Sequence, residues 1–525
     1  MSPLDCKYGK HLDYSLRSLT TAMDYGKTPV KTFLYFRNTH LDDKVAPMWW
    51  LTYSWSMSKV KVLSFLMGLT VTFVIIASYI ITWNNKGLFC TLLPVQFRPV
   101  VVLTSTASTD ISFGNNSIDM KLLVKIIASK LDYTPRKVPD EKEIFETDSH
   151  LFSVFPRQFL PGIKSPCWYK EYNASSSKPY RRNLYRLHSR KFRAVCDHLR
   201  MNFSQRLHYQ NGKMFRLRCL PFFYIIGQPK CGTTDLYHRL LLHPEVKFNT
   251  LKEPHWWTRK RFGPLLVESQ KRVPLEDYLD LFDLAAHNIQ EVIRGHSSGD
   301  QRALQFITGE ASASTMWDNR VLHNLRKDKD ESEPPFLAQD FIHTVQPNAK
   351  IIIILRDPVE RLYSDYLYFQ RGNKSTEDFH QRVVESVQWF QSCLLENSLR
   401  TCVYNASLVE PMPLRFVLGM YVAYLLDWLT VFHKEQILVI RLEDYAANLN
   451  GTLKKVFDFL DLDPLSEQQM ATLINMPTSN SRRKEDVTLG PMLPATRNLL
   501  REFHQPFNHK LASVLDNKAF LWSNA

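Results

Sequence analysis

Three short runs of apolar, mostly β-branched residues constrain the fold of this chain most strongly. They are Phe222 to Ile226 (FFYII), Lys350 to Leu355 (KIIIIL) and Ile437 to Ile440 (ILVI), and helical patterns follow them. Such runs are typical of strands buried on both faces of a sheet, and strands that alternate with helices form parallel sheets. We therefore predict an α/β domain with a central, mainly parallel sheet flanked by helices.

An uncharged stretch, Val62 to Trp83, precedes this domain. As a helix rising ~1.5 Å per residue it would span roughly 33 Å, enough for the hydrocarbon layer of a membrane. It lacks the polar face of a buried core helix, and it lies too far from Met1 for a cleaved signal peptide. We predict a cytosolic segment over 1–61, a transmembrane signal anchor over 62–83, a lumenal stem over 84–150 and a lumenal domain over 151–525.

Asn-x-Ser/Thr sequons decide the orientation of this helix, because the positive charges on its two sides are nearly balanced. All six sequons follow the helix, and sequons are usable only in the secretory lumen. They begin at Asn115, Asn173, Asn202, Asn373, Asn405 and Asn450. The sequence therefore predicts a single-pass type II membrane glycoprotein whose folded domain is lumenal.

The eight cysteines form no CxxC pair and no Cys/His cluster at zinc spacing, so we expect no metal site. Cys393 and Cys402 are close enough in sequence to close a short disulfide loop in an oxidising lumen; two unpaired thiols are the alternative. Cys167, Cys196 and Cys219 could supply further bridges, but the sequence leaves their pairing open.

The net charge of the chain is +14, which favours an anionic partner. Nucleic acid, an acidic membrane and a sulfated polysaccharide all meet this condition. Charge alone does not choose among these partners.

A glycine-rich loop follows the first predicted strand and precedes a helical segment. It reads Gly227-Gln-Pro-Lys-Cys-Gly232-Thr-Thr. Such a loop directs backbone N–H groups and a helix N-terminus at an anion. Its glycine spacing is that of a nucleotide-binding P-loop, but Thr233 stands where the Walker lysine belongs, and the lysine, Lys230, is inside the loop. This difference disfavours a kinase or ATPase; taken alone, the loop could also be a structural turn.

A second polar segment, LRDPVERLYSDY, follows the KIIIIL strand directly. Pro358 suits the first turn of a helix, so Arg356 would lie at the end of the strand and Ser364 about two turns along the helix. A guanidinium and a hydroxyl so placed could bind one phosphate. Ligands of open α/β sheets bind at the carboxyl ends of strands, where both segments are predicted to lie. A structural ion pair is the alternative for Arg356 and Asp357, and it is favoured for Asp357 and Arg361.

Together, these two segments resemble the cosubstrate motifs of the Golgi carbohydrate sulfotransferases. The resemblance extends from about Phe222 to the C-terminus, so the motif-bearing core is 222–525. It implies a P-loop-like sulfotransferase domain that uses 3′-phosphoadenosine 5′-phosphosulfate as cosubstrate without an obligatory metal. It also implies that Arg356 and Ser364 bind the 3′-phosphate. The loop residues implied to bind the 5′-phosphosulfate are Gly227, Gln228, Pro229, Lys230, Cys231, Gly232, Thr233 and Thr234.

Several stretches, among them KEPHWWTRKRFG and GEASASTMWD, are most similar to the family members that sulfate N-acetylgalactosamine 4-sulfate at its 6-hydroxyl. This similarity implies that the partners are chondroitin and dermatan sulfate chains rather than nucleic acid, that the products are 4,6-disulfated units, and that the protein resides in the Golgi membrane. Another glycosaminoglycan position and a noncatalytic glycosaminoglycan-binding receptor are the alternatives. The sequence leaves open whether the chain forms a homodimer.

The resemblance also suggests catalytic roles. Lys230 would stabilise the charge that builds on the leaving oxygen. Glu253 matches the catalytic glutamate of related heparan sulfotransferases and would act as the base, with His255 as a second candidate. A surface carboxylate and a structural histidine are the respective alternatives.

Candidate acceptor-binding residues surround this pair. They are Lys252, Trp256, Trp257, Arg259, Glu310 and Ser312, with Lys260, Arg261 and Ser314 as further candidates. Buried packing is the equal alternative for the two tryptophans. The relatives carry a lysine after the glutamate that corresponds to Glu310, but this chain has Ala311. Either Lys230 suffices or another cation such as Lys252 substitutes. Near the C-terminus, Arg482 and Arg483 resemble a basic loop that closes over the cosubstrate; a solvated turn is the alternative.

Overall fold

The computed structural model describes residues 119–523, except 132–134, 174–178, 248–250, 262–271, 296–303, 323–332 and 371–373. The predicted membrane anchor over 62–83 and the sequons at Asn115 and Asn373 lie outside the described residues. Within those residues, no helix combines the length and apolar character needed to cross a membrane.

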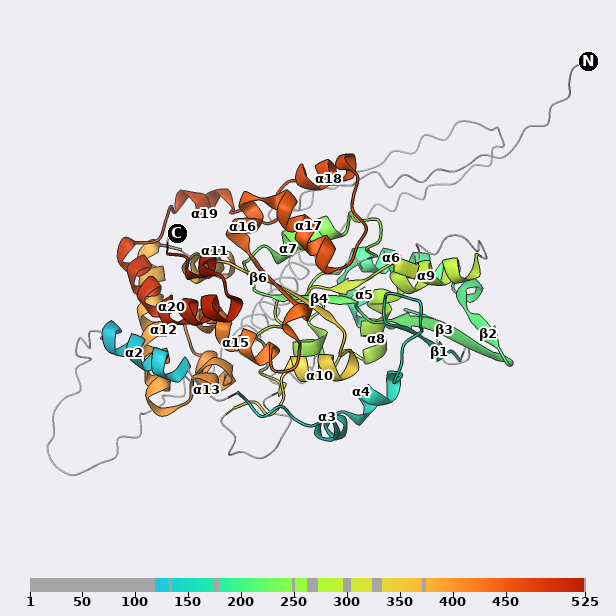
Figure 1. The fold of residues 1–525 in the computed structure, drawn as a ribbon, viewed down its shortest axis with the longest axis horizontal. Helices are drawn as coiled ribbons and strands as arrows, with labels where there is room; N and C mark the ends of the chain where they lie inside the picture. The colour runs from blue at the N-terminus through green and yellow to red at the C-terminus, as the bar shows by residue number, and fades with distance from the viewer. Residues whose placement is uncertain are drawn as a thin grey trace, which may run out of the picture. The chain divides into compact units, whose positions relative to one another are not determined.

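A parallel four-stranded sheet forms the centre of the fold (Figure 1). Its strands lie in the order β5-β4-β6-β7. Their bounds are Phe223–Gly227 for β4, Gly309–Glu310 for β5, Lys350–Leu355 for β6 and Ile437–Arg441 for β7. The α/β prediction and its three strands are confirmed. Strand β5 was not predicted, because two residues without an apolar run give no strand signal.

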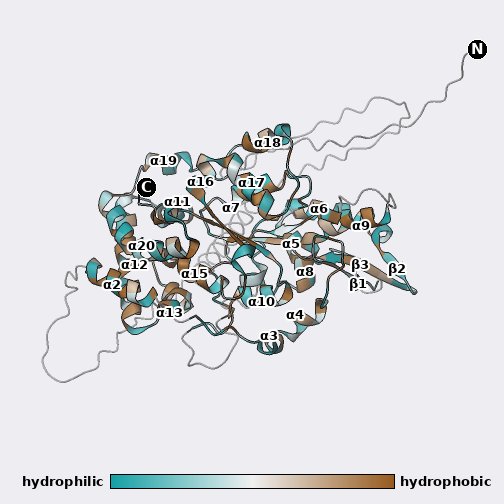
Figure 2. Cartoon of the chain, viewed as in Figure 1, coloured by the Kyte–Doolittle hydropathy of each residue, from teal (hydrophilic) through white to brown (hydrophobic). Residues whose placement is uncertain are grey.

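Alternate residues of the central strands pack on opposite faces of the sheet, as the period of a strand requires. On one face, Ile225 and Ile352 share a buried cluster with residues of α7 (Thr233–Leu240) and α17 (Leu449–Phe459). The apolar strands at the centre appear brown in Figure 2. Helices therefore cover this face and exclude water from it.

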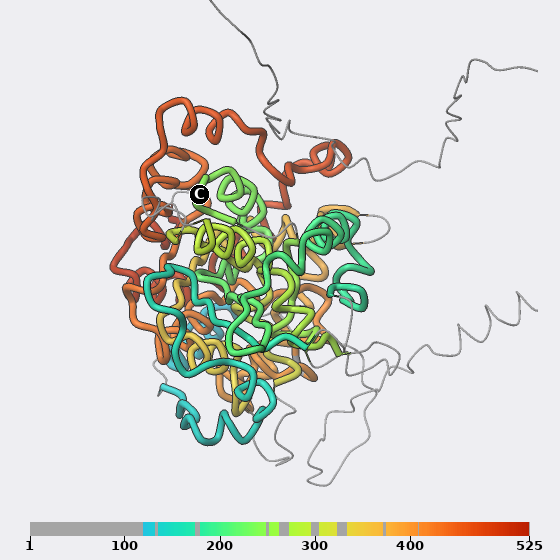
Figure 3. Tube along the Cα trace, turned by 90° about the vertical axis from the view of Figure 1, so that its right-hand side faces the viewer, coloured from blue at the N-terminus to red at the C-terminus, as the bar shows by residue number. Residues whose placement is uncertain are grey.

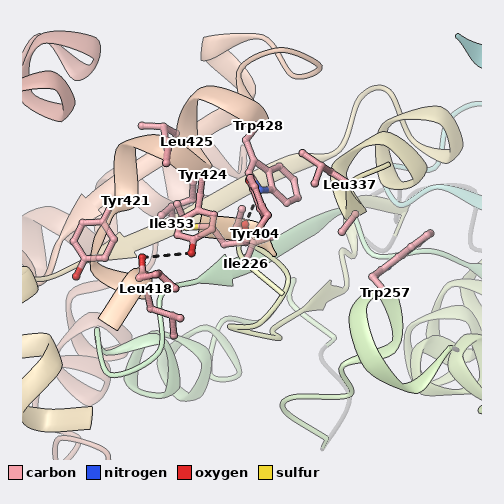
Figure 4. Close-up of a cluster of buried hydrophobic side chains, with 14 of the residues drawn as sticks. Ile226, Trp257, Leu337, Ile353, Tyr404, Leu418, Tyr421, Tyr424, Leu425 and Trp428 are labelled. Carbon is pink, nitrogen blue, oxygen red and sulfur yellow. Dashed lines mark hydrogen bonds between the residues drawn. The ribbon is translucent and has the colours of Figure 1, made fainter. Parts of the chain in front are cut away.

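The other face of the sheet contacts a larger apolar cluster, which includes α10 (Ala338–Val345) and α15 (Tyr421–Trp428). Figure 4 shows Ile226 and Ile353 of the sheet beside the aromatic side chains of α15. The Trp428 indole N–H donates to the Met316 carbonyl (3.3 Å), so its polar atom is satisfied inside the core. Burial on both faces fixes where the strand ends lie.

A second, antiparallel sheet has the order β1-β3-β2, with β1 at Cys167–Glu171, β2 at His208–Gln210 and β3 at Lys213–Cys219. Cys167 pairs with Cys219 in the register of β1 and β3, and the two form a disulfide. The predicted Cys393–Cys402 disulfide is confirmed; it joins α12 (Thr376–Glu396) to α13 (Leu399–Tyr404). Cys196 and Cys231 are buried free thiols.

Three helices precede β1 and belong to the same compact unit as both sheets. They are α2 (Met120–Leu131), α3 (Glu141–Thr147) and α4 (Ser149–Val154). Helix α2 packs on the long C-terminal helix α20 (Pro494–Leu515) and buries Leu123, Ile127 and Leu131. Figure 3 shows α3 and α4, coloured cyan, along the edge of the unit. The packed unit thus includes residues that the sequence assigned to the stem.

The remaining helices complete the unit around the sheets. The α-helices are α5 (Leu184–His188), α6 (Arg190–Met201), α8 (Leu275–Leu279), α9 (Asp283–Arg294), α11 (Pro358–Phe369), α14 (Ala406–Val409), α16 (Leu442–Ala447), α18 (Glu467–Ile474) and α19 (Lys484–Thr488). The short 3-10 and π segments are η1 (Ser204–Arg206), η2 (Trp256–Lys260), η3 (Asp280–Phe282), η6 (Phe416–Gly419), η7 (Lys434–Gln436) and η8 (Lys518–Leu521).

Three of the predicted sequon asparagines, Asn173, Asn202 and Asn450, are exposed. Asn405 is half-buried, and its side-chain oxygen accepts from the N–H (3.0 Å) and hydroxyl (2.6 Å) of Ser407. Glycosylation stays a prediction at all of these positions.

Candidate active site

A cleft of about 590 Å³ opens at the carboxyl ends of the parallel strands. Residues that follow each of the four strands line it: Pro229, Lys230 and Gly232 to Thr234 after β4, Ala313 and Ser314 after β5, Arg356 after β6 and Leu442 after β7. Ligands bind at this edge in open α/β sheets, so the predicted location of the site agrees with the fold.

The glycine-rich loop crosses this edge and leads into α7. Gly232 caps the helix at φ +89°, and a Cβ there would lie 2.7 Å from Leu442 Cδ1, so the turn requires glycine on both counts. The N-terminus of α7 therefore faces the cleft with Thr233 and Thr234 on its wall. The arrangement suits an anion.

Not every predicted loop residue reaches the cleft. Gln228 is buried, and its backbone N–H donates to the Ile354 carbonyl of β6 (2.8 Å). Cys231 is also buried, with its Sγ 4.0 Å from the Tyr421 hydroxyl. Gly227 lies against Met316, where an added Cβ would be 2.9 Å from Met316 Cβ. These three residues hold the loop to the core, whereas Pro229, Lys230, Gly232, Thr233 and Thr234 line the cleft.

Lys230 is the cation of the loop. Its Nζ lies 3.6 Å from the centroid of the Tyr368 ring, near the end of α11. Burial lowers the Lys230 pKa to about 8; Asp365 opposes this shift, and Arg356 and Arg415 add to it. Near neutral pH the ammonium is thus charged but poorly hydrated, and an anion bound here would be favoured.

Arg356 and Ser364 also line the cleft, one just before α11 and the other within it. Asp357 caps this helix by accepting from the Val359 N–H (2.9 Å). The Arg361 guanidinium pairs with Asp365 (2.7 Å) inside the fold, so Asp357 and Arg361 are structural, as predicted. Arg356 and Ser364 do line the cleft, and their binding of a ligand stays a prediction.

The Glu360 carboxylate forms ion pairs with three arginines, one of which, Arg356, lines the cleft. Arg356 (3.6 Å), Arg482 (3.4 Å) and Arg497 (2.6 Å) all pair with its carboxylate. Asp357 and Glu443 lie close to the same group, so the three arginines share their carboxylate partners. Arg482 and Arg483 are exposed and border the cleft rather than line it; the residues of their loop that line it are Thr478, Ser479 and Asn480.

Asp235 ties that C-terminal loop to α7, a contact that the sequence analysis missed. Its carboxylate accepts from the Ser479 N–H (2.9 Å), the Tyr445 hydroxyl (2.6 Å) and Arg239 Nε (2.7 Å). Burial would raise the Asp235 pKa, but these hydrogen bonds outweigh it and lower the pKa. Asp235 and Arg239, spaced four apart on the helix, were the available signal.

Glu253, the predicted base, also lines the cleft. Its Oε1 pairs with the Lys252 ammonium, its Oε2 accepts from the Ala313 N–H (2.9 Å), and His255 Nε2 lies 3.5 Å from Oε2. Lys252, Glu253 and His255 all line the cleft. The backbone of Glu253 and His255 is left-handed (φ +62° and +53°), a strained conformation that often marks functional sites. The predicted base therefore faces the cleft with its carboxylate held from three sides.

His255 is fixed by two serines that follow β5. Its Nδ1 lies 2.7 Å from Ser314 Oγ, and its backbone N–H donates to Ser312 Oγ (2.9 Å). Burial lowers the His255 pKa to about 4; Glu253 opposes the shift, and Arg259 adds to it. The imidazole is thus neutral at pH 7, which suits an orienting or hydrogen-bonding role better than that of a cation.

Four predicted acceptor contacts are wrong. Trp256 and Trp257 are each 2% exposed. Their indole N–H groups donate to the Val273 carbonyl and the Tyr278 hydroxyl (3.0 Å each) inside the fold, so neither ring faces the cleft. Glu310 and Ser312 are each 1% exposed and bond to each other beneath the cleft. Burial raises the Glu310 pKa to about 8.

The predicted rim cations differ in their accessibility. Arg261 is buried in an ion pair with Asp148 and is not free for a polymer. Lys260 is exposed, and Arg259 lines the cleft. Arg415 also lines it and was not predicted. The sequence feature that could have indicated a role for Arg415 is that it is the only charged residue in the otherwise apolar run MPLRFVLGM.

In the described part of the chain, no group of three or more His, Cys, Asp or Glu side chains is placed to hold a metal ion.

Comparisons with known proteins give consistent matches. Residues 221–510 match a family model described as "Sulfotransferase domain". Over 484 residues the chain is 50% identical to carbohydrate sulfotransferase 15 of Mus musculus and 49% identical to that of Homo sapiens. Each alignment covers 88% of this chain and 86% of the relative. Among solved structures, a sulfotransferase from Alicyclobacillus acidocaldarius matches with 21% identity and a TM-score of 0.37, over 57% of this chain and 98% of that one.

Proposed function

Because this chain belongs to the sulfotransferase family and is a carbohydrate sulfotransferase, we propose that it sulfates the 6-hydroxyl of N-acetylgalactosamine 4-sulfate in chondroitin and dermatan sulfate. The donor is 3′-phosphoadenosine 5′-phosphosulfate, and the products are 4,6-disulfated units. The observation that carries this proposal is one cleft lined both by the anion-binding loop around Lys230 and by the Glu253 carboxylate, and the two groups of lining residues are named by the substrate that each would bind. We refer to these as the donor end and the acceptor end.

The residues at the donor end fit a nucleotide with two anionic groups. The N-terminus of α7, with Thr233 and Thr234, would hold the 5′-phosphate, while Arg356 and Ser364 would hold the 3′-phosphate. The three arginines that pair with Glu360 would favour the same ligand. Protonated Lys230 would stabilise the oxygen that leaves the sulfuryl group, the charge-stabilising role that contributes most to such transfers.

At the acceptor end, Glu253 would accept the proton of the sugar hydroxyl as its oxygen bonds to sulfur and the bond from sulfur to the phosphate oxygen breaks. The Ala313 N–H and neutral His255 hold this carboxylate in place. Lys252 pairs with Glu253 and lines the cleft, so it supplies a cation where Ala311 replaces the lysine of the relatives.

The cellular setting belongs to the same proposal. We place the protein in the Golgi membrane, anchored by residues 62–83, with its glycosylated catalytic domain in the lumen. The apolar run and the one-sided sequons support this location. The two disulfides of the described residues are typical of an oxidising compartment.

A labelling experiment tests the reaction and its acceptor. The full-length protein is supplied with radiolabelled donor and with chondroitin 4-sulfate, desulfated chondroitin or heparan sulfate, and the products are digested to disaccharides. We expect label in 4,6-disulfated galactosamine units, and roughly a thousandfold slower labelling by the Lys230→Ala variant.

Other outcomes would change the proposal in different ways. Label on another polymer alone would keep the reaction and reject the acceptor. No label on any polymer, from folded protein that still binds the donor, would favour the noncatalytic glycosaminoglycan-binding receptor.

A further inference from the structure

Two arginines of the cleft, Arg259 and Arg415, have no role in the steps above. Both line the cleft, and their side chains are 39% and 34% exposed. Arg259 lies in η2, just after His255, and Arg415 directly precedes η6. They therefore reach the cleft from segments far apart in the sequence.

Arg415 is held rigidly but is not neutralised. Its Nε and Nη2 both bond to Asp365 (2.8 to 3.0 Å), and its guanidinium lies 3.9 Å from the centroid of the Phe369 ring. Asp365 also pairs with Arg361, which is fully buried. Asp365 carries one negative charge, and it pairs with the two positively charged guanidinium groups of Arg361 and Arg415. The pairing therefore leaves a net positive charge, and Arg415 is the member that is exposed in the cleft.

Arg259, in η2, is anchored in a similar way by a carboxylate and an aromatic ring. Its Nε pairs with Asp318, and its guanidinium lies 5.5 Å from the Trp317 ring. Asp318 is in turn shared with Arg320, which does not line the cleft. The contact with Asp318 uses Nε of Arg259. Within the described residues, its two terminal nitrogens make no hydrogen bond, so both can donate to a ligand.

The charges of these groups interact with one another and with the reacting groups. Burial lowers the pKa of Arg415; Asp365 opposes the shift, while Arg361 and Arg259 add to it. Arg415 likewise contributes to the lowered pKa of Lys230, and Arg259 to that of His255. The two arginines therefore lie close to the place where transfer would occur.

We propose that Arg259 and Arg415 together bind the sulfate already present on the acceptor sugar, and so make the enzyme selective for 4-sulfated galactosamine. This inference rests on the proposed function. In the galactosamine ring, C4 and C6 are both bonded to C5, so a 4-sulfate lies beside the 6-hydroxyl that attacks. Its binding site must therefore adjoin Lys230 and Glu253 rather than lie on a distant rim.

The chemistry of the two side chains suits this ligand. A guanidinium donates two parallel hydrogen bonds to a sulfate or carboxylate, and rigid anchoring lowers the entropic cost of binding. Arg415 is already anchored by Asp365 and Phe369, and Arg259 by Asp318. A flexible surface lysine would offer neither advantage.

Kinetics with paired acceptors tests the inference. Arg415→Gln and Arg259→Gln are compared with the wild type on chondroitin 4-sulfate and on desulfated chondroitin, at saturating donor. We expect each substitution to lower the ratio of kcat/KM for the sulfated over the unsulfated polymer roughly ten- to hundredfold. The change should fall mainly on the acceptor KM. Arg415→Lys should restore only part of the preference, because an ammonium lacks the fork.

Arg320→Gln is the matched control, since it removes a charge from the same Asp318 pair outside the cleft. It should leave the ratio unchanged. Equal losses on both polymers in the Arg415→Gln and Arg259→Gln variants would overturn the inference and assign the arginines to the sulfuryl group in transfer.

A binding measurement separates this inference from the proposed function. Calorimetric titration compares a 4-sulfated with an unsulfated chondroitin oligosaccharide on the wild type and on Arg415→Gln. If the wild type transfers sulfate to neither polymer but binds the sulfated oligosaccharide more tightly through Arg415, the arginine site stands and the proposed reaction fails. If the two oligosaccharides bind the wild type equally, the arginine site is rejected, whatever the enzyme sulfates.

Discussion

The donor end and the acceptor end of the cleft are built in different ways. The donor end is built from two contiguous segments: the loop that requires Gly232 with the N-terminus of α7, and the segment from Arg356 to Ser364 that leads into α11. The acceptor end uses side chains from separate segments whose charges pair with one another, as Lys252 does with Glu253 and Arg259 with Asp318. The difference predicts that the donor end serves any acceptor, while the acceptor end decides which sugar reacts.

The largest expected effect is at Lys230. Lys230→Ala should lower kcat by roughly a thousandfold, because the charge on the leaving oxygen loses its cation. The loss should be the same on every acceptor polymer, as expected for a donor-end group. Radiolabel transfer at saturating donor measures it, with Lys230→Arg as a control that keeps the charge. A loss that depended on the acceptor would break the division between the two ends.

Removal of the base should have the next largest effect. Glu253→Gln keeps the shape of the side chain but cannot take a proton, so kcat should fall about a hundredfold or more. Donor affinity, measured by calorimetry, should change less than about threefold, since Glu253 lies at the acceptor end. A parallel loss of donor affinity would show that the two ends are not independent.

A smaller effect is expected at the 3′-phosphate contacts. Arg356→Gln should raise the donor KM roughly tenfold or more through the loss of a charge-assisted hydrogen bond, with the acceptor KM unchanged. Ser364→Ala should do the same more weakly, because a neutral hydroxyl bonds less strongly than a guanidinium. A change in acceptor KM alone would move Arg356 to the other end of the cleft.

The smallest effect concerns pH. Burial holds the Lys230 pKa near 8, so the charged form needed for transfer is lost as pH rises through about 8. In free enzyme, kcat/KM for the donor should therefore fall up to about tenfold per pH unit above that value. At saturating donor, kcat should fall at higher pH, because bound anions raise the lysine pKa. Lys230→Arg should flatten both profiles in this range.

The sequence predicted the donor end well for a physical reason. A strand, a glycine loop and a helix are contiguous, and their anion-binding geometry follows from local backbone conformation. The central strands were predicted from the same local pattern. The short strand β5 was missed, since its two residues take strand conformation only by pairing with β4.

The acceptor end was predicted less well, because its residues meet only in the folded chain. Trp256 and Trp257 looked like sugar platforms, yet the turn that exposes Glu253 and His255 directs both indoles into the core. Arg415 was overlooked because its partner, Asp365, lies fifty positions earlier in the sequence. Sequence pattern gives residue type and spacing but does not show which charges compensate one another in space.

With the membrane anchor that we propose, the contact between α2 and α20 would be the first packed contact of the chain after the stem. Lys130 at the end of α2 donates to the Asn397 carbonyl (2.6 Å), just after α12 ends. Helix α2 therefore contacts two parts of the C-terminal half, α20 and the end of α12. A pull along the stem would load these helices first, and not the strands that carry the catalytic groups. A truncated form that begins at residue 151 would lack α2 and would expose the apolar side chains of α20 that α2 covers. A form that begins before Met120 would keep α2, and these side chains would stay covered.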